Sequence, residues 1–269
     1  MSIVRKIING KEIFYNRELD IISRNTIDGQ YTQQDGIYTR TISEGVYDTC
    51  FEITTKCNQC CKNCFACSSP GKGEEMKYEC IEDLISKKES ERIRIGITGG
   101  EPFLHSEILK VLELPHKFSN LNFMVSTNGN FELTNKIKKK LIDGKWLVSL
   151  SIHGDKAAHN LYTQSESFDT VILNLSKLNE NVIIHTYTVI NRYMTENDID
   201  YILDLQDRYK IYYTRFIIPR NVGRVDFQYD DRLVDYIHRK VQDNNKAGIK
   251  KDYSHTELIN VALNSRIIG

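Results

Sequence analysis

The stretch IRIGITGGEPFLH at residues 93–105 joins a short apolar run to a glycine-rich turn. Its isoleucines alternate with other residues, as buried side chains do on a β-strand. Gly99 and Gly100 follow, and glycine lets the backbone approach a ligand closely. By itself the Gly-Gly-Glu sequence is better explained by a structural turn, so its meaning depends on the rest of the chain.

Apolar runs of this kind recur along the sequence and alternate with helical patterns. The runs are Phe51–Thr54, Ile93–Ile97, Leu121–Val125, Trp146–Ile152, Val182–Ile190 and Ile211–Ile218. Their spacing is close to the length of a βαβ unit. Six such units predict an α/β fold with a parallel sheet, either open or curled into a partial barrel. Function is then expected at the carboxyl ends of the strands.

Helical periodicity fills the intervals between the runs. Thr195 and Asp198 form a capping box, which predicts the start of a helix. Apolar residues at helical spacing are Phe168, Val171, Ile172, Leu175 and Leu178 in one interval, Leu133, Ile137 and Leu141 in another, and Leu233, Ile237 and Val241 after the last run.

The first 47 residues differ from the rest. Residues 7–13 read IINGKEI, which predicts a β-hairpin around a tight Asn-Gly turn. We therefore expect a short N-terminal extension over residues 1–47 and one barrel domain over residues 48–269.

Charge and hydropathy exclude several classes of protein. Lysine plus arginine and aspartate plus glutamate both total 36, so the formal net charge is zero. A neutral chain lacks the positive field of a general nucleic-acid-binding protein. No apolar run approaches the roughly 18 residues of a membrane-spanning helix, and the first residues do not read as a signal peptide. We expect a cytoplasmic protein that does not bind membranes.

The seven cysteines are crowded into one short part of the chain, and none follows residue 80. An odd, crowded set argues against a disulfide framework and favours metal ligands in a reducing compartment. We expect Cys50 and Cys80 to be small core residues. The cysteines are Cys50, Cys57, Cys60, Cys61, Cys64, Cys67 and Cys80.

The loop TTKCNQCCKNCFACSS at residues 54–69 limits the kind of metal site. Structural zinc commonly needs two CxxC pairs separated by a loop, and here the pairs overlap. A bacterial ferredoxin run requires a cysteine where Gly71 stands. The spacing CxxxCxxC fits, and three thiolates so placed bind three irons of a cubane and leave the fourth open. That spacing is satisfied by Cys57, Cys61 and Cys64, and also by Cys60, Cys64 and Cys67.

The sequence around these cysteines resembles the cluster loop of the radical S-adenosylmethionine (radical SAM) superfamily. Cys57-Asn58 and Cys64-Phe65 match places where that family often has Cys-Asn and an aromatic residue after the last cysteine. The resemblance favours Cys57, Cys61 and Cys64 as ligands of a 4Fe–4S cluster. Asn63 departs from the family, which usually has an aromatic residue there against the adenine.

The resemblance continues at the ends of the later strands and implies a set of SAM-binding residues. The Gly-Gly-Glu turn would bind the methionine amino group of SAM. The segment STNGN at 126–130 would contact the ribose, and the segment FIIPRNVGR at 216–224 would contact the adenine. The implied contacts are Gly99, Gly100, Glu101, Ser126, Asn128, Ser151, Asn191 and Ile217.

Other positions depart from the peptide- and sulfatase-modifying members. His153 and Asn160 replace aspartates, and Thr163 stands where an arginine often binds the SAM carboxylate. That carboxylate would then fall to Arg192 or Arg220. We expect His153 and His159 not to be metal ligands.

Membership of this family implies a partial (β/α)6 TIM-like barrel and an enzyme. It would cleave SAM reductively to a 5'-deoxyadenosyl radical, which abstracts hydrogen from a small-molecule or peptide substrate. A flavodoxin or ferredoxin would supply the electron. Because no cysteine follows Cys80, we expect a single 4Fe–4S cluster and no C-terminal auxiliary-cluster domain. The sequence identifies neither the substrate nor a catalytic hydrogen donor.

Two other classes remain open. An iron–sulfur electron carrier would bind its cluster without cleaving SAM, and a regulatory metal-binding module would bind metal without turnover.

Overall fold

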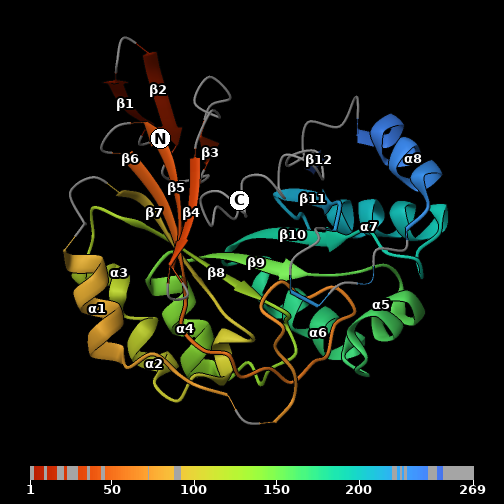
Figure 1. Cartoon of the computed structure of the whole chain (residues 1–269), viewed down its shortest axis with the longest axis horizontal. Helices are drawn as coiled ribbons and strands as arrows, with labels where there is room; N and C mark the ends of the chain where they lie inside the picture. The colour runs from red at the N-terminus through yellow and green to blue at the C-terminus, as the bar shows by residue number, and fades with distance from the viewer. Residues whose placement is uncertain are drawn as a thin grey trace.

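The computed structural model describes residues 3–8, 11–16, 21–22, 30–34, 37–43, 46–71, 73–87, 92–219, 223–224, 226, 229–241 and 247–250 (Figure 1). Its strands are β1 (Ile3–Ile8), β2 (Lys11–Asn16), β3 (Ile21–Ile22), β4 (Gln30–Gln34), β5 (Ile37–Ser43), β6 (Val46–Glu52), β7 (Arg92–Thr98), β8 (Asn122–Thr127), β9 (Leu147–Ser151), β10 (Ile183–Val189), β11 (Tyr213–Ile217) and β12 (Ala247–Lys250). Its helices are α1 (Tyr78–Ser86), η3 (Pro102–Leu104), α2 (Ile108–Val111), α3 (Leu114–Lys117), α4 (Asn135–Asp143), α5 (Lys156–Thr163), α6 (Phe168–Leu178), α7 (Glu196–Arg208) and α8 (Asp231–Val241).

One sheet organises the molecule. Among the described residues it has nine strands in the order β12-β11-β10-β9-β8-β7-β6-β5-β4. Neighbouring strands from β6 to β12 are parallel, whereas β5 and β4 continue the sheet in antiparallel pairing. The six predicted parallel strands are present and the sheet stays open, which confirms the α/β partial-barrel prediction. The sequence did not predict β12, which is short and contains a glycine.

The core lies between the sheet and the helices, which cover its outer side (Figure 1). Helix α6 buries Phe168, Val171, Leu175 and Leu178, as its periodicity predicted. Each fully buried side chain of this kind contributes roughly 1.5–3 kcal/mol. Helix α7 begins with the predicted capping box at Thr195. This packing fixes the strands and thereby positions the loops at their carboxyl ends.

The N-terminal hairpin was predicted correctly. Strands β1 and β2 pair antiparallel, with Ile8 opposite Lys11 across the two-residue connection at 9–10. Strands β4 and β5, however, belong to the same sheet as the barrel strands, and β6 crosses the predicted boundary between residues 47 and 48. The division into an extension and a barrel domain stays a prediction.

One cysteine prediction was wrong. Cys80 is exposed on α1, because the buried face of that helix carries Tyr78, Ile81 and Ile85 and residue 80 falls outside this spacing. Cys50 is half-buried on β6, where a Cβ added at Gly96 would lie 2.3 Å from its sulfur. In the part of the chain described here, no helix is both long and apolar enough to cross a membrane.

Candidate functional site

The structure brings all the predicted site residues to the carboxyl edge of the sheet. Each lies at the end of its strand or directly after it. Cys57, Cys61 and Cys64 follow β6, Gly99, Gly100 and Glu101 follow β7, Ser126 and Asn128 stand at the end of β8, Ser151 ends β9, Asn191 follows β10 and Ile217 ends β11.

The cysteine loop, by which we mean residues 54–69, starts beside residues 74–76, the segment that follows it. The N–H of Thr55 donates to the carbonyl of Glu74 (3.0 Å), and the N–H of Met76 donates to the carbonyl of Ile53 (2.8 Å). The Thr54 hydroxyl also donates to the Glu74 carbonyl. The loop is therefore closed at its base, and its cysteines cannot spread along an extended chain.

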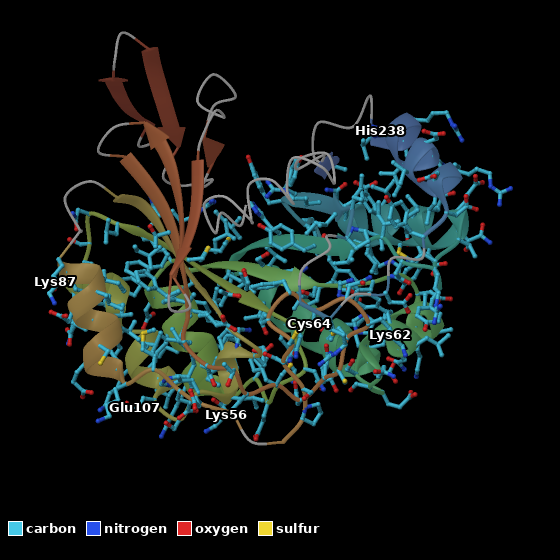
Figure 2. All side chains as sticks on the ribbon, viewed as in Figure 1. Lys56, Lys62, Cys64, Lys87, Glu107 and His238 are labelled. Atoms are coloured by element: carbon cyan, nitrogen blue, oxygen red, sulfur yellow. The ribbon has the colours of Figure 1, made fainter. Side chains whose placement is uncertain are left out.

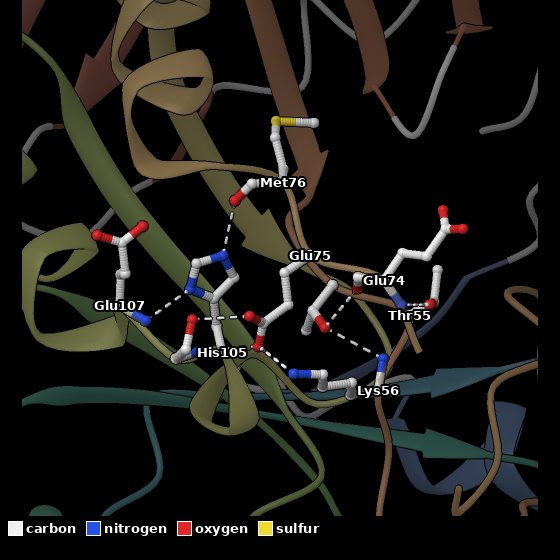
Figure 3. A network of polar contacts seen from close by, with 9 residues as sticks. Thr55, Lys56, Glu74, Glu75, Met76, His105 and Glu107 are labelled. Carbon is white, nitrogen blue, oxygen red and sulfur yellow. Dashed lines mark hydrogen bonds and ion pairs between the residues drawn. The ribbon is translucent and has the colours of Figure 1, made fainter. Parts of the chain in front are cut away.

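A polar network fixes this base to the segment after β7 (Figure 3). Glu75 accepts hydrogen bonds from the backbone and hydroxyl of Ser106 and pairs with Lys56 at 2.9 Å. Partial burial acts to raise the pKa of Glu75, but Ser106 and Lys56 lower it to about 2. His105 Nδ1 accepts from the N–H of Glu107, so Nε2 donates to the carbonyl of Met76. Lys56, directly before Cys57, is thus fixed in place.

The two glycines of the Gly-Gly-Glu turn allow it to pack against the start of the loop. Gly99 has φ +155°, and a Cβ there would lie 2.4 Å from the carbonyl oxygen of Thr54. A Cβ at Gly100 would lie 2.3 Å from that of Lys56. The N–H groups of Gly100 and Glu101 donate to these same two carbonyls, each at 2.8 Å. Residues without a side chain are therefore required at both positions.

Glu101 is completely buried and joins this turn to the next one. Its carboxylate accepts from the N–H of Phe103 (3.1 Å), the hydroxyl of Thr127 (2.8 Å) and the N–H of Asn128 (2.7 Å). Burial raises its pKa to about 7, against the lowering effect of these three hydrogen bonds. The carboxylate therefore connects the loops after β7 and β8.

Asn128 in turn connects the loop after β8 to the cysteine loop. Its Nδ2 donates to Asn58 Oδ1 (2.9 Å) and lies 3.7 Å from the sulfur of Cys57. Asn58 Nδ2 donates to the carbonyl of Asn130. Three loops that are far apart in sequence therefore meet beside Cys57.

The three thiols of Cys57, Cys61 and Cys64 form a donor set that fits an iron–sulfur cluster. All three are free, and burial raises the pKa of each. The charges of Cys64 and Cys57 raise the pKa of Cys61 further, so the sulfurs lie within one another's field. Such thiols stay protonated alone and release their protons to a metal.

In the described part of the chain, no three cysteine, histidine or acidic side chains converge on one metal ion. A cubane does not need such convergence, because each thiolate binds a different iron.

The alternative set of Cys60, Cys64 and Cys67 has a different environment. Cys67 is exposed and has φ +52°. The N–H of Cys60 donates to the carbonyl of Thr163, at the end of α5. Of the two sets, only that of Cys57, Cys61 and Cys64 has no exposed cysteine.

The end of α5 also supports the cysteine loop. The N–H of Lys62 donates to the carbonyl of Tyr162, and Figure 2 shows Lys62 close to this helix. The Tyr162 hydroxyl donates to the carbonyl of Asn63 (2.9 Å), and the side chain of Gln59 donates to Ser167. Gln59 also accepts from the thiol of Cys61 at 3.5 Å.

Arg224, which sequence reasoning missed, binds the cysteine loop from the segment after β11. Its guanidinium donates to the carbonyls of Cys61 (2.8 Å), Cys67 (3.2 Å) and Ser68 (2.9 Å). Its backbone exchanges two hydrogen bonds with Cys64. Its charge lowers the pKa of Cys61 and Cys64, against the larger effect of burial. About 160 residues separate the partners, so no local sequence signal could reveal the contact.

The other predicted SAM contacts have simpler surroundings. Ser126, Ser151 and Ile217 are half-buried at their strand ends. Asn191 is buried, donates to the carbonyl of Val189 and accepts from the N–H of Tyr193.

Asn63, which departs from the family pattern, and the two arginines expected to bind the SAM carboxylate have separate outcomes. Asn63 accepts from the N–H of Asp226, and its Nδ2 is buried without a partner. Arg192 pairs with Asp226 at 3.2 Å. Arg220 lies outside the described residues.

His153 and His159 form a buried pair with structural contacts. His153 Nδ1 accepts from the N–H of Val189, and His159 Nδ1 accepts from the N–H of His153. Burial lowers the pKa of both, that of His159 to about 4, so both rings are neutral. These contacts account for both Nδ1 atoms without a metal.

Known proteins are similar to this chain in sequence and in fold. The model of the Radical SAM superfamily matches residues 51–205. A probable GTP 3',8-cyclase of Thermoplasma volcanium is 29% identical over 136 residues, which are 48% of this chain and 40% of that protein.

Two solved structures share the fold. SuiB of Streptococcus suis bound to S-adenosylmethionine has a TM-score of 0.65 at 15% identity, over 77% of this chain and 53% of SuiB. The structure of anSMEcpe with bound AdoMet has a TM-score of 0.56 at 21% identity, over 74% of this chain and 63% of that one. The chain thus spans less than two thirds of these proteins' own lengths.

The family model covers more than half of the chain, and the fold and the cysteine loop agree with it. The protein therefore belongs to the radical SAM superfamily and is an enzyme of this class, whose members use a 4Fe–4S cluster and S-adenosylmethionine.

Proposed function

We propose that Cys57, Cys61 and Cys64 of this chain bind a single 4Fe–4S cluster for the reductive cleavage of SAM. The observation that carries the proposal is the support of this one loop from three directions. The turns after β7 and β8, the end of α5 and Arg224 all contact it. Such support is expected where thiols must keep a fixed geometry through a change of charge.

When bound, the cluster would supply an electron to SAM and so generate a 5'-deoxyadenosyl radical for hydrogen abstraction from the substrate. The chain's own residues position the reactants and exclude water. Asn128 and Arg224 direct N–H groups at Cys57 and at the loop carbonyls, respectively. Hydrogen bonds and nearby positive charge are among the features that set the potential of such a cluster.

The proposed SAM contacts follow the strand ends from β7 to β11. Glu101 belongs to this set. Its three hydrogen bonds also position the Gly-Gly-Glu turn against the loop after β8. The proposed contacts are Gly99, Gly100, Glu101, Ser126, Asn128, Ser151, Asn191 and Ile217.

We place the activity in the cytoplasm, with a flavodoxin or ferredoxin as electron donor and a small molecule or a peptide as substrate. General nucleic-acid binding is not part of the proposal, because the net charge of the chain is zero.

The test is anaerobic incubation of the reconstituted, dithionite-reduced chain with SAM. Formation of 5'-deoxyadenosine, lost in Cys61→Ala, is the expected result. A fully loaded protein with about four irons that forms none of this product would be an electron carrier or a regulatory module instead.

A further inference from the structure

The inner face of the sheet, by which we mean the face opposite the helices, carries polar side chains of β9, β10 and β11. Side chains alternate between the two faces along a strand. Val148 and Ile184 pack into the helix-side core, so their neighbours Ser149 and His185 point to the inner face. The strand register places Ser149 beside His185, and His185 beside Tyr213.

Among the described residues, two polar atoms on this face are buried and have no hydrogen-bond partner. They are Ser149 Oγ and His185 Nε2, in side chains that are 1% and 7% exposed. An unpaired buried polar atom costs roughly 1–3 kcal/mol. Two such atoms on adjacent strands point to a group that is supplied from outside the chain.

Arg215 provides a cation next to these atoms. Its neighbour Phe216 packs against the helices, so Arg215 also points to the inner face. The guanidinium lies 5.4 Å from the ring centre of Tyr187 and 5.6 Å from that of Tyr213. Among the described residues no carboxylate pairs with it, and it is half-buried. Stacking on two rings orients the guanidinium before any ligand binds.

The local field on this face is positive. Burial first, and then the charges of Arg215 and Arg94, lower the pKa of His185 to about 3. The imidazole is therefore neutral and can donate a hydrogen bond from Nε2. Among the side chains that the structure describes, Glu52 is an acidic one on the same face, but β7, β8 and β9 separate its strand from β10.

We propose that Arg215, His185 and Ser149 bind the anionic group, a carboxylate or a phosphate, of the substrate. This inference rests on the proposed function and names a substrate class for it. Arg215 stands two residues before the end of β11, and His185 four before the end of β10. At about 3.3 Å per residue, the anion would lie roughly 7–13 Å inside the carboxyl edge. A small molecule anchored there extends toward the cysteine loop.

The test is equilibrium dialysis of radiolabelled inorganic phosphate and of radiolabelled succinate against the reconstituted full chain. We expect one of the two anions to bind saturably, at one site per chain. Arg215→Gln removes a charged donor, so its affinity should fall at least about tenfold. Arg208→Gln is the matched control, because Arg208 is exposed on α7 and pairs with Asp204. It should change the affinity less than about twofold.

A second variant keeps the test decisive if Arg215→Gln does not fold. His185→Gln should weaken the same anion at least about threefold, with a circular dichroism spectrum like that of the wild type. Which probe binds tells whether the substrate group is a phosphate or a carboxylate.

Three results would overturn the inference: no saturable binding of either anion, equal binding by Arg215→Gln, or displacement of the anion by SAM. Displacement would assign Arg215 to the carboxylate of SAM. Formation of 5'-deoxyadenosine is measured separately, so a failure of the anion site leaves the proposed function standing.

Discussion

Two sets of buried polar side chains differ in this molecule: the network around Glu101 at the carboxyl edge of the sheet, and Ser149 with His185 on its inner face. At the edge, Glu101 is fully buried and accepts three hydrogen bonds from the chain. On the inner face, Ser149 and His185 are also buried, but each leaves a polar atom without a partner among the described residues. Since burial without a partner is costly, the Glu101 network is complete as a structure, whereas the pair Ser149 and His185 is completed by a ligand.

This difference separates residues that maintain the structure of the site from residues that bind a ligand. The edge network connects three loops and determines where Cys57 lies. The inner face contributes little to that geometry. Substitutions at the edge should therefore damage the cluster site, whereas substitutions on the inner face should change ligand binding and spare the fold.

The largest effect at the edge is expected from Arg224→Gln. The shorter neutral amide cannot reach the carbonyls of Cys61, Cys67 and Ser68 together, so the loop loses three charge-assisted hydrogen bonds. We expect iron content after reconstitution to fall to less than about half. The cluster that remains should have a lower midpoint potential, because a positive charge is removed. Wild-type iron content and potential would show that Arg224 does not support the loop.

A pH series on Glu101→Gln isolates the buried carboxyl. In the wild type its pKa is raised to about 7 from an ordinary 4.5, so the folded state binds this proton more tightly. Protonation of Glu101 therefore contributes to the free energy of unfolding. This contribution, up to about 3 kcal/mol, is fully present below pH 4.5 and is lost as the pH rises through 7. Glutamine mimics the protonated acid, so urea unfolding of the variant should lack this fall. Equal slopes in the two proteins would contradict the assignment.

The smallest effects are expected on the free energy of unfolding when one hydroxyl is removed from each region. Thr127→Val removes a hydroxyl that donates to Glu101 and accepts from Gly129, and should destabilise by about 2 kcal/mol. Ser149→Ala removes a buried hydroxyl with no partner and should stabilise the ligand-free chain by about 1 kcal/mol. Urea unfolding of both variants measures the difference. Equal destabilisation would remove the distinction between the two regions.

The motifs at the strand ends could be predicted from the sequence because each consists of residues that are close together in the chain. The apolar runs predicted six parallel strands, and the Gly-Gly-Glu turn after β7 showed where the backbone is closely packed. Arg224 could not be predicted from the sequence, because its partners lie about 160 residues away and only the folded sheet brings them together. Strand β12 was missed because pairing with β11, rather than its own apolar pattern, makes it a strand.

Cys80 shows a different limit of sequence reasoning. A cysteine close to a cysteine-rich loop was expected in the core, but helical geometry places residue 80 off the buried face of α1. The type of a residue indicates whether it tends to be buried, whereas its position around the helix decides whether it faces the core.

The most direct test is the formation of 5'-deoxyadenosine by Cys61→Ala and Cys67→Ala, reconstituted and reduced side by side with the wild type. Cys61 lies deep between the supporting segments, and Cys67 is exposed. We predict that Cys61→Ala forms no 5'-deoxyadenosine and that Cys67→Ala forms it at a rate near that of the wild type. Product from Cys61→Ala, or its loss in Cys67→Ala alone, would contradict the assignment of Cys57, Cys61 and Cys64 as the cluster ligands.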